Sequence, residues 1–268
     1  MCSIRVTKPP IIGMTDTRNL LVRGVATLCL LLTQGIAATF AEVPVNTLSE
    51  QEKADGWELL FDGVTSTGWR GINRPDFPTT GWVIASGELQ CAADDGAESG
   101  NGGDIITVNK YSNFEMAWDW AMDSVGGNSG VKIFVLEGLD ANPKHGVGLE
   151  YQILDDENHP WMLKGKMKPG DFRTVGSAYE LYAAKNKTVM PLGQYNHSRI
   201  VSKGDHIEHW LNGVKVVQYQ RGSDDFRKRV AESKSCDIKN YGEAAEGHIL
   251  IQDHGSRVRF RNIKIRPL

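Results

Sequence analysis

The chain has 268 residues, of which 30 are basic and 33 acidic, so its formal net charge is −3. This length suffices for a substantial core. Basic residues do not outnumber acidic ones, as they do in most proteins that bind nucleic acid or an anionic membrane surface. Without its first 41 residues the chain would keep 26 basic and 32 acidic residues, a net charge of −6, which strengthens that exclusion.

The N-terminus is predicted to be a cleaved signal peptide. Arg18 and Arg23 precede an apolar run over residues 25–38 that is short for a membrane span and rich in small residues. The segment ends at Ala41, with small residues at the two positions that a signal peptidase recognises. A membrane anchor is the alternative. We therefore expect a periplasmic or secreted protein. The expected parts are a signal peptide, a linker and one domain: residues 1–41, 42–56 and 57–268.

Alternation of apolar and polar residues predicts strands along most of the remaining chain. The clearest run is FEMAWDWAM, and Asn212-Gly213 is a strong hairpin signal inside another. One short helix is expected after Ser223-Asp224-Asp225. Strands in series with Gly, Asn and Asp turns indicate an all-β sandwich of two antiparallel sheets, or a jelly roll. The expected strand regions are residues 114–122, 128–137, 148–154, 197–220 (with turns at 203–205 and 212–213), 247–255 and 258–267.

Two long segments, about residues 155–195 and 221–246, show no strand pattern. Loops of this length inside a compact domain are usually functional or disordered. The first contains Trp161, Tyr179 and Tyr182, and aromatic residues at this density argue against disorder. We therefore expect an ordered loop that covers a site.

Polar side chains are expected on the non-core face of three strands. Alternation places Glu150 and Gln152 together on one face, and it places Gln252 and His254 on the corresponding face of a later strand. Arg261 points outward from the last strand by the same argument. A solvated outer face is the alternative, but this mixture of groups favours a sugar site. The residues assigned to the core are Trp118, Trp120, Ile133, Tyr151, Ile153, Ile249, Ile251 and Phe260.

Two further residues have competing interpretations. His209 alternates with aliphatic residues, so periodicity buries it in the core. Asp155 follows Glu150 by five positions, which is similar to the Glu-x-Asp-x-x-Glu strand of laminarinase-type retaining glycosidases. Those enzymes need two carboxylates about 5 Å apart. Here the middle acid is replaced by Gln152 and the last is the shorter Asp, so the match is poor. A retaining glycosidase that uses Glu150 and Asp155 is kept as an alternative.

A series of motifs covers nearly the whole chain after residue 41. It includes LLFDGVTSTGWR (59–70), GNSGV (127–131), LEYQILDDENH (149–159), SAYELYAAK (177–185), YNHSRIV (195–201), IEHWLNGVKVV (207–217) and GHILIQDHG (247–255). In this series the chain resembles the 3-keto-disaccharide hydrolase family, whose domain is also described as a 3-keto-glucoside lyase and 3-keto-2-hydroxyglucal hydratase. Tyr195 stands where the family usually has Trp, a mild change.

The resemblance implies a concanavalin-like or laminin-G-like jelly roll with its carbohydrate ligand on the concave face. It also implies a reaction. A ketone at C3 of a glycoside acidifies the C2 proton, so that a general base removes it and the enolate expels the C1 aglycone. Water then adds to give 3-keto-glucose. A divalent metal at the ketone oxygen is compatible with this chemistry, although the sequence shows no strong metal-ligand spacing.

The predicted site residues come from two arguments together, the outward faces of the strands and the family resemblance. Glu150 is expected to be the general base or a metal ligand, and in the second case His254 becomes the base. SAYELYAAK implies that Tyr179 and Lys185 approach Glu150, and HWLNG favours a functional His209. A non-catalytic carbohydrate-binding module is a further alternative; an enzyme would instead bring Glu150, His254 and Arg261 into one pocket. The expected catalytic residues are Glu150, His254, His209 and Tyr179, and the expected substrate-binding residues are Asn128, Gln152, Asp155, Lys185, Gln252 and Arg261.

Overall fold

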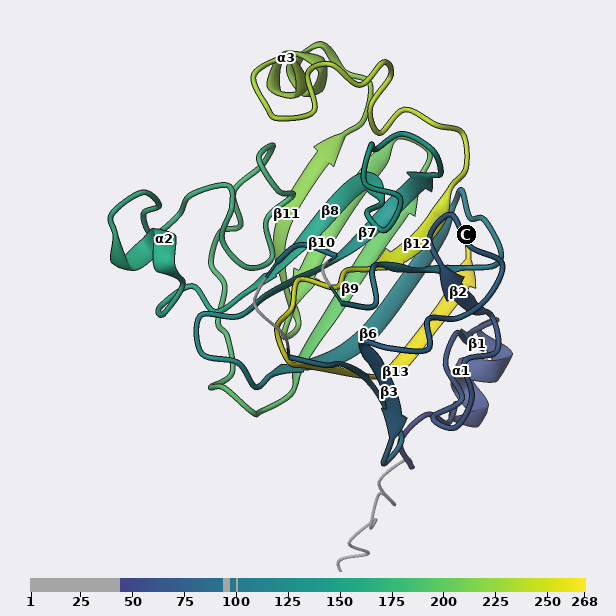
Figure 1. Ribbon diagram of the computed structural model, residues 1–268. Coiled ribbons are helices and arrows are strands. Elements are labelled where there is room, and N and C mark those ends of the chain that lie inside the picture. The colour runs from purple at the N-terminus through teal and green to yellow at the C-terminus, as the bar shows by residue number, and fades with distance from the viewer. Residues whose placement is uncertain (1–43, 94–96, 100) are drawn as a thin grey trace, which may run out of the picture. The chain divides into compact units, whose positions relative to one another are not determined.

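A computed structural model describes residues 44–93, 97–99 and 101–268 (Figure 1). The predicted signal peptide lies outside the described residues. In the part of the chain that is described, no helix is long and apolar enough to cross a membrane.

Two antiparallel sheets form a jelly-roll sandwich, as the sequence predicts. The strands of the first sheet are β1 (Glu58–Leu59), β3 (Trp82–Ala85), β4 (Glu88–Cys91), β6 (Phe114–Met122), β9 (Asn196–Lys203), β10 (His206–Leu211), β11 (Val214–Gln220) and β13 (Val258–Pro267). Those of the second sheet are β2 (Trp69–Gly71), β5 (Ile105–Thr107), β7 (Asn128–Leu136), β8 (Val147–Leu154) and β12 (His248–Ile251). The order is β11-β10-β9-β6-β13-β4-β3 in the first sheet, where β1 pairs with β13, and β2-β5-β12-β7-β8 in the second.

The period-two pattern locates these strands well. β6 coincides with the FEMAWDWAM run, and β10 and β11 are joined at Asn212-Gly213. Both turn residues have positive φ angles, 48° and 81°. A two-residue hairpin turn with positive φ at both positions matches the twist of the strands, which explains why Asn-Gly is a strong hairpin signal.

Helices are short. α3 (Asp224–Ala231) begins where it was predicted, and the Ser223 hydroxyl accepts a hydrogen bond from the Phe226 amide. Two other helices were not predicted, α1 (Glu50–Ala54) and α2 (Pro160–Leu163). Each is about one turn long, so neither can show the 3.6-residue period by which a helix is recognised in sequence.

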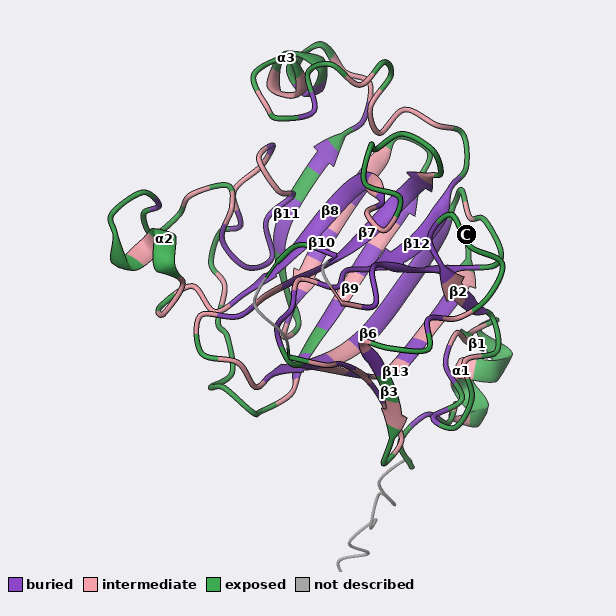
Figure 2. Ribbon diagram, viewed as in Figure 1, coloured by how far each residue is buried: buried purple, intermediate pink, exposed green. Residues whose placement is uncertain are grey.

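The core lies between the two sheets, and all eight residues assigned to it are buried (Figure 2). The Trp118 ring on β6 meets the Tyr151 ring on β8 edge-on, with centroids 5.1 Å apart, so this contact joins the sheets. The Tyr151 hydroxyl is satisfied inside the core, because it donates to the Trp210 carbonyl and accepts from Ser198. Neither Cys91, which is buried, nor Cys236, which is exposed, forms a disulfide within the described residues.

Candidate functional site

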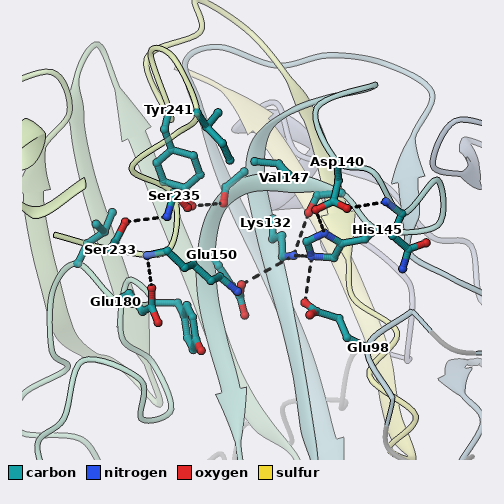
Figure 3. A pocket seen from close by; sticks show the side chains of 17 residues that line it. Glu98, Lys132, Asp140, His145, Val147, Glu150, Glu180, Ser233, Ser235 and Tyr241 are labelled. Atoms are coloured by element: carbon teal, nitrogen blue, oxygen red, sulfur yellow. Dashed lines mark hydrogen bonds and ion pairs between the residues drawn. The ribbon is translucent and has the colours of Figure 1, made fainter. Parts of the chain in front are cut away.

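The site is built on the outer face of the second sheet. Glu150 on β8 and Lys132 on β7 are opposite each other in the strand register, and both point away from the core residues Leu149 and Tyr151. The Lys132 Nζ lies 3.8 Å from the Glu150 Oε2, and both side chains are less than one-tenth exposed (Figure 3). Burial of a lone charged group is costly, so each of these two side chains supplies the partner that the other needs.

A glycine makes room for the Glu150 carboxylate. A Cβ added to Gly130 on β7 would lie 2.9 Å from the Glu150 Oε1 and 3.2 Å from its Cδ. The side chain of Glu150 therefore leans across from β8 and lies over Gly130. In the register Gly130 is opposite Gln152, and its carbonyl accepts from the Gln252 amide. Gly130 thus leaves a gap on the outer face of the sheet, between Gln152 on one side and Gln252 on the other.

The long segment after β8 covers this face and brings Tyr179 to Glu150. Residues 176–179 pair with β8 like a further strand: the Gly176 amide donates to the Gln152 carbonyl at 2.8 Å, and the Tyr179 amide donates to the Glu150 carbonyl at 3.0 Å. Tyr179 is therefore fixed beside Glu150 by backbone pairing. Burial, reinforced by the negative charges of Glu150 and Glu180, raises the pKa of the Tyr179 phenol, so this group stays protonated at neutral pH.

Two adjoining cavities open on this face. The first, here named the lysine pocket, has a volume of about 270 Å³ and is lined by Lys132, Asp140, His145, Ile238 and Tyr241 among others. The second, named the amide pocket, has a volume of about 360 Å³ and is lined by Asn128, Gln152, Trp161, Gln252 and His254 among others. The residues common to both are Glu98, Glu150, Tyr179, Glu180 and Lys234. Glu150 and Tyr179 thus lie where the pockets meet.

A charged network fixes Lys132 in the lysine pocket (Figure 3). Its Nζ donates to the Gly146 carbonyl at 2.9 Å and lies 2.9 Å from the His145 Nε2. The same His145 nitrogen is 3.0 Å from Glu98, and the Nδ1 is 2.9 Å from Asp140. Burial is the largest influence and opposes the charged imidazolium, but the hydrogen bond to Glu98 and the negative charges of Asp104 and Glu98 together outweigh it, so the pKa of His145 is raised. The hydrogen bond from His145 also holds the pKa of Glu98 well below its usual range.

Six of the predicted site residues gather here. Glu150 and Tyr179 line both pockets, and the amide pocket also contains Asn128, Gln152, Gln252 and His254. The other four lie elsewhere.

Arg261 is on the wrong sheet for the predicted site. It lies on β13 of the first sheet, opposite Asp119, with its guanidinium 3.6 Å from the centre of the Tyr195 ring. The prediction that Arg261 joins Glu150 is therefore wrong. Alternation identifies an outward side chain, but a sandwich has two outer faces, and a period of two does not distinguish them.

Asp155 also points away from Glu150. Its carboxylate accepts hydrogen bonds from the Gly126 amide and the Asn158 side chain, both at 2.8 Å, and so fixes the turn after β8. It lines a separate cavity beside Lys187 and Met190. The structure therefore does not place Asp155, predicted to bind substrate, in the pockets that Glu150 lines. This geometry does not support the alternative of a retaining glycosidase either, because the two carboxylates do not share a pocket.

Lys185 and His209 were also misplaced. Lys185 donates its backbone amide to the Val216 carbonyl and lines a surface hollow with Tyr182 and Lys215, away from both pockets. His209 is 1 % exposed and lies in the core, where its Nδ1 is 3.1 Å from the Gly176 carbonyl and burial lowers its pKa to about 4. Periodicity placed His209 correctly, and the expectation of a site role is wrong.

Lys132, His145 and Glu98 were missed by the sequence analysis. Lys132 carried a usable signal, since a lone lysine inside the apolar run GVKIFVL must be buried and needs a partner. His145 and Glu98 come from irregular loops, where no periodicity indicates the direction of a side chain.

Divalent metal ligation at Glu150 was left open by the sequence. The described residues contain no group of three or more His, Cys, Asp or Glu side chains arranged to hold a metal ion. The Glu150 carboxylate is paired with the Lys132 ammonium instead. These residues therefore do not fit the role of a metal cage.

The fold is a jelly roll, and one of its sheets carries a cavity lined by a carboxylate and several amides. Jelly rolls include lectin domains, which bind carbohydrate. The model of the 3-keto-alpha-glucoside-1,2-lyase-like domain matches residues 56–266. The chain belongs to this family.

Relatives agree with this assignment. The chain is 32 % identical over 236 residues to a 3-keto-disaccharide hydrolase of Bacteroides thetaiotaomicron, which covers 80 % of this chain and 79 % of the relative. A crystal structure of a Parabacteroides distasonis protein designated a glycosyl hydrolase is 38 % identical, with a TM-score of 0.74, and the match covers 84 % of this chain and all of that one. A second structure so designated from the same organism is 31 % identical, with a TM-score of 0.59 over 79 % of this chain and 99 % of that one.

Proposed function

We propose that the protein is an exported enzyme that cleaves 3-keto-glycosides by elimination and hydration, with net hydrolysis to 3-keto-glucose. Family membership supports the substrate class. The observation that carries the mechanism is the position of Glu150, which lies at the junction of the two pockets, with Lys132 on one side and His254 on the other.

The order of these groups matches the order of the reacting atoms. In a 3-keto-glycoside the C3 carbonyl, the C2 proton and the C1–oxygen bond follow one another around the ring. Lys132 lines only the lysine pocket, Glu150 lines both, and His254 lines only the amide pocket. With the keto ring in the lysine pocket, a cation faces the ketone oxygen, a base faces C2 and an acid faces the glycosidic oxygen.

Elimination begins when the Glu150 carboxylate takes the C2 proton. The electron pair of that C–H bond forms the enolate, whose negative O3 is stabilised by the Lys132 ammonium, a side chain that is almost wholly buried. The enolate then re-forms the C3 ketone, its electron pair forms a C1=C2 double bond, and the C1–oxygen bond breaks to leave the enone. The departing oxygen accepts a hydrogen bond from the protonated Tyr179 phenol and takes its proton from the His254 imidazolium.

Hydration uses the same groups in reverse order. Water adds to C1 of the enone while His254 accepts its proton, and Lys132 again stabilises the enolate at O3. Glu150 returns the first proton to C2. The sum is one water consumed, one glycosidic bond broken and both residues restored to their starting protonation states.

The test is Glu150→Gln, assayed on a 3-keto-glucoside and on the parent glucoside. The wild type should turn over only the keto sugar, because only the ketone acidifies C2. Loss of the general base should lower kcat by about 10²–10⁴-fold with little change in ligand binding. The matched control is Glu157→Gln, an exposed carboxylate in the loop after β8 that lines neither pocket. Wild-type activity in Glu150→Gln would disprove the role assigned here.

Export is tested separately. The protein recovered from the periplasm or medium of its host should begin at Glu42. A protein that retains residues 1–41 in the membrane fraction would contradict this part of the proposal.

A further inference from the structure

We propose that two buried carboxylates, those of Asp104 and Asp253, are positioning residues for the reaction. Together they are named the aspartate brace. The brace lines neither pocket, yet it fixes the chain segments that place Lys132 on one side of Glu150 and His254 on the other. Its role rests on the proposed function, in which these three side chains are the cation, the base and the acid.

Neither carboxylate of the brace is accessible to a ligand. Asp104 directly precedes β5 and is 1 % exposed, and Asp253 follows β12 by two residues and is 0 % exposed. Burial raises the pKa of Asp104, an effect that the Lys132 charge and the Gly146 amide only partly offset. A buried carboxylate is costly unless hydrogen bonds satisfy it. Two such groups that touch no ligand are suited to hold the chain around them in one arrangement.

One end of the brace fixes Lys132. The Asp104 Oδ2 accepts a hydrogen bond from the Gly146 amide, and the Gly146 carbonyl accepts one from the Lys132 Nζ, both at 2.9 Å. Gly146 is also tightly packed, because a Cβ added there would lie 2.2 Å from the Leu250 Cδ1. Asp104 therefore determines the position of the carbonyl to which the ammonium is bound.

The other end of the brace fixes the turn that carries His254. The Asp104 Oδ1 accepts from the Asp253 amide at 3.0 Å, and the Asp253 Oδ2 accepts from the Gly103 amide at 2.9 Å, so the two segments are joined reciprocally. The Asp253 Oδ1 also accepts from the Gly255 amide at 3.0 Å. His254 lies between two residues that are held in this way, and its backbone is fixed as a result.

The buried thiol of Cys91 completes this end. Its Sγ donates to the Asp253 Oδ1 at 3.2 Å and accepts a hydrogen bond from the His254 amide. Burial, reinforced by the negative charge of Asp253, raises the pKa of the thiol, so it remains a protonated donor. Because Cys91 lies on β4 of the first sheet, the thiol connects the sandwich to the backbone of the catalytic turn.

The brace also holds the segment that carries Glu98. The Ser99 hydroxyl donates to the Asp104 Oδ1 at 3.2 Å, and the Ser99 amide donates to the Asp253 carbonyl at 2.7 Å. The neighbouring Glu98 lines both pockets and is paired with His145 (Figure 3). Irregular segments that are far apart in sequence thus converge on two carboxylates. Such support matters for a reaction because misplacement of a catalytic group by about 1 Å can cost about 10²-fold in rate.

The first experiment compares two leaving groups in Asp253→Asn. Both oxygens of Asp253 accept from backbone amides, so an asparagine must present its NH₂ group to one of them and displace the turn. His254 protonates a departing alkoxide, whereas a nitrophenolate leaves without a proton. We expect kcat/KM for methyl 3-keto-glucoside to fall about 10²-fold, and that for nitrophenyl 3-keto-glucoside to stay within about threefold. Equal losses with both substrates, or none with either, would overturn the assignment.

Asp104→Asn should give a different pattern. Its carbonyl can keep the bonds from Asp253 and Ser99, which leaves the NH₂ group facing the Gly146 amide and displaces the carbonyl that holds Lys132. The enolate needs this cation whichever group leaves, so kcat/KM should fall about 10²-fold for both substrates. A loss confined to the methyl glycoside would contradict the role at Lys132.

Asp62→Asn is the matched control. The carboxylate of Asp62 also accepts two backbone amides, those of Val64 and Thr65, but it is exposed and lines neither pocket. Its kcat/KM should stay within about twofold of the wild type for both substrates. A loss as large as those of the brace variants would show that any disturbed turn slows the enzyme, and would overturn the specific role of the brace.

Cys91 gives a test that leaves both carboxylates in place. Cys91→Val removes the hydrogen bonds to Asp253 and His254 at similar volume, and Cys91→Ser keeps a donor and an acceptor there. The valine variant should slow the methyl glycoside about tenfold and spare the nitrophenyl glycoside, and the serine variant should restore the rate to within about threefold of the wild type. Wild-type activity in Cys91→Val would overturn the link to His254.

The last experiment separates the brace from the chemistry. In NMR spectra of nitrogen-labelled protein, Asp104→Asn should move the amide signals of Gly146 and Asp253, and Asp62→Asn should leave them unchanged. Moved signals in a protein whose wild type turns over no 3-keto sugar would overturn the proposed function, and the role of the brace with it. If Glu150→Gln abolishes turnover while both brace variants keep the wild-type kcat/KM, the brace is overturned and the chemistry stands.

Discussion

Gly130→Ala tests whether the position of the Glu150 carboxylate matters for activity. The added methyl group would lie 2.9 Å from the Glu150 Oε1, 3.1 Å from Cγ and 3.2 Å from Cδ, whereas ordinary contacts begin near 3.4 Å. The carboxylate must therefore retreat by roughly half an ångström. Misplacement by about 1 Å can cost about 10²-fold in rate. We therefore expect kcat to fall by about tenfold, although Glu150, the proposed base, is still present.

Stability should change much less than rate. Gly130 does not need a positive φ, so alanine is compatible with its backbone, and the lower entropy of the unfolded chain offsets part of an overpacking cost of about 1–3 kcal/mol. Gly71→Ala is the matched control, since its Cβ would meet Arg74 at 3.2 Å in another part of the same sheet. The assay is steady-state turnover of a 3-keto-glucoside beside urea unfolding. Unchanged kcat in a folded Gly130→Ala protein would refute the assigned position of Glu150.

Two further predictions concern the site, and a third concerns the buried His209. Lys132→Met removes the cation opposite the enolate and should lower kcat by about 10²–10³-fold, measured in a variant confirmed to be folded because Glu150 loses its ion pair. Tyr179→Phe removes only the hydroxyl beside the leaving oxygen and should lower kcat by about 10–10²-fold with little change in KM. His209 is buried and neutral with its pKa lowered to about 4, so the unfolded chain binds more protons than the folded one below about pH 6.5. It should therefore cost about 3 kcal/mol of stability as the pH falls from 6.5 to 4; in urea unfolding His209→Gln should lessen this loss, and equal slopes for both proteins would contradict it.

Much of the fold follows from the sequence because a buried face imposes a period of two. Phe114 to Met122 alternate strictly, and β6 occupies that run. The same rule placed Glu150, Gln152 and Gln252 on the outer side of their strands, and these three residues do line one cavity. Each prediction of this kind asks only whether a side chain faces the core or the outer side of its sheet, and burial of the apolar face decides this.

The site is less predictable because it depends on pairing between distant strands and on loops. Arg261 and Glu150 are both outward, yet strand order places them on different sheets. Asp155 follows Glu150 closely in sequence, but β8 has ended and the local turn uses its carboxylate. Glu98 and His145 reach the pocket from irregular segments and are held there by each other. Nothing in the local sequence specifies such contacts.

In the proposed mechanism, one strand nevertheless indicates the direction in which the substrate would lie. Asn128, Gly130 and Lys132 are successive outer positions of β7, two residues apart, and each occupies a different part of the two pockets. Lys132 places a cation in the lysine pocket, Gly130 leaves the gap into which Glu150 leans, and Asn128 lines the amide pocket. Alternate residues on a strand are separated by about 6.5–7 Å, which is more than the distance between adjacent ring atoms of a sugar. Under the proposed function the three positions correspond to the keto side, the reacting centre and the leaving group, and a substrate bound in this order would extend along β7 from Lys132 toward Asn128.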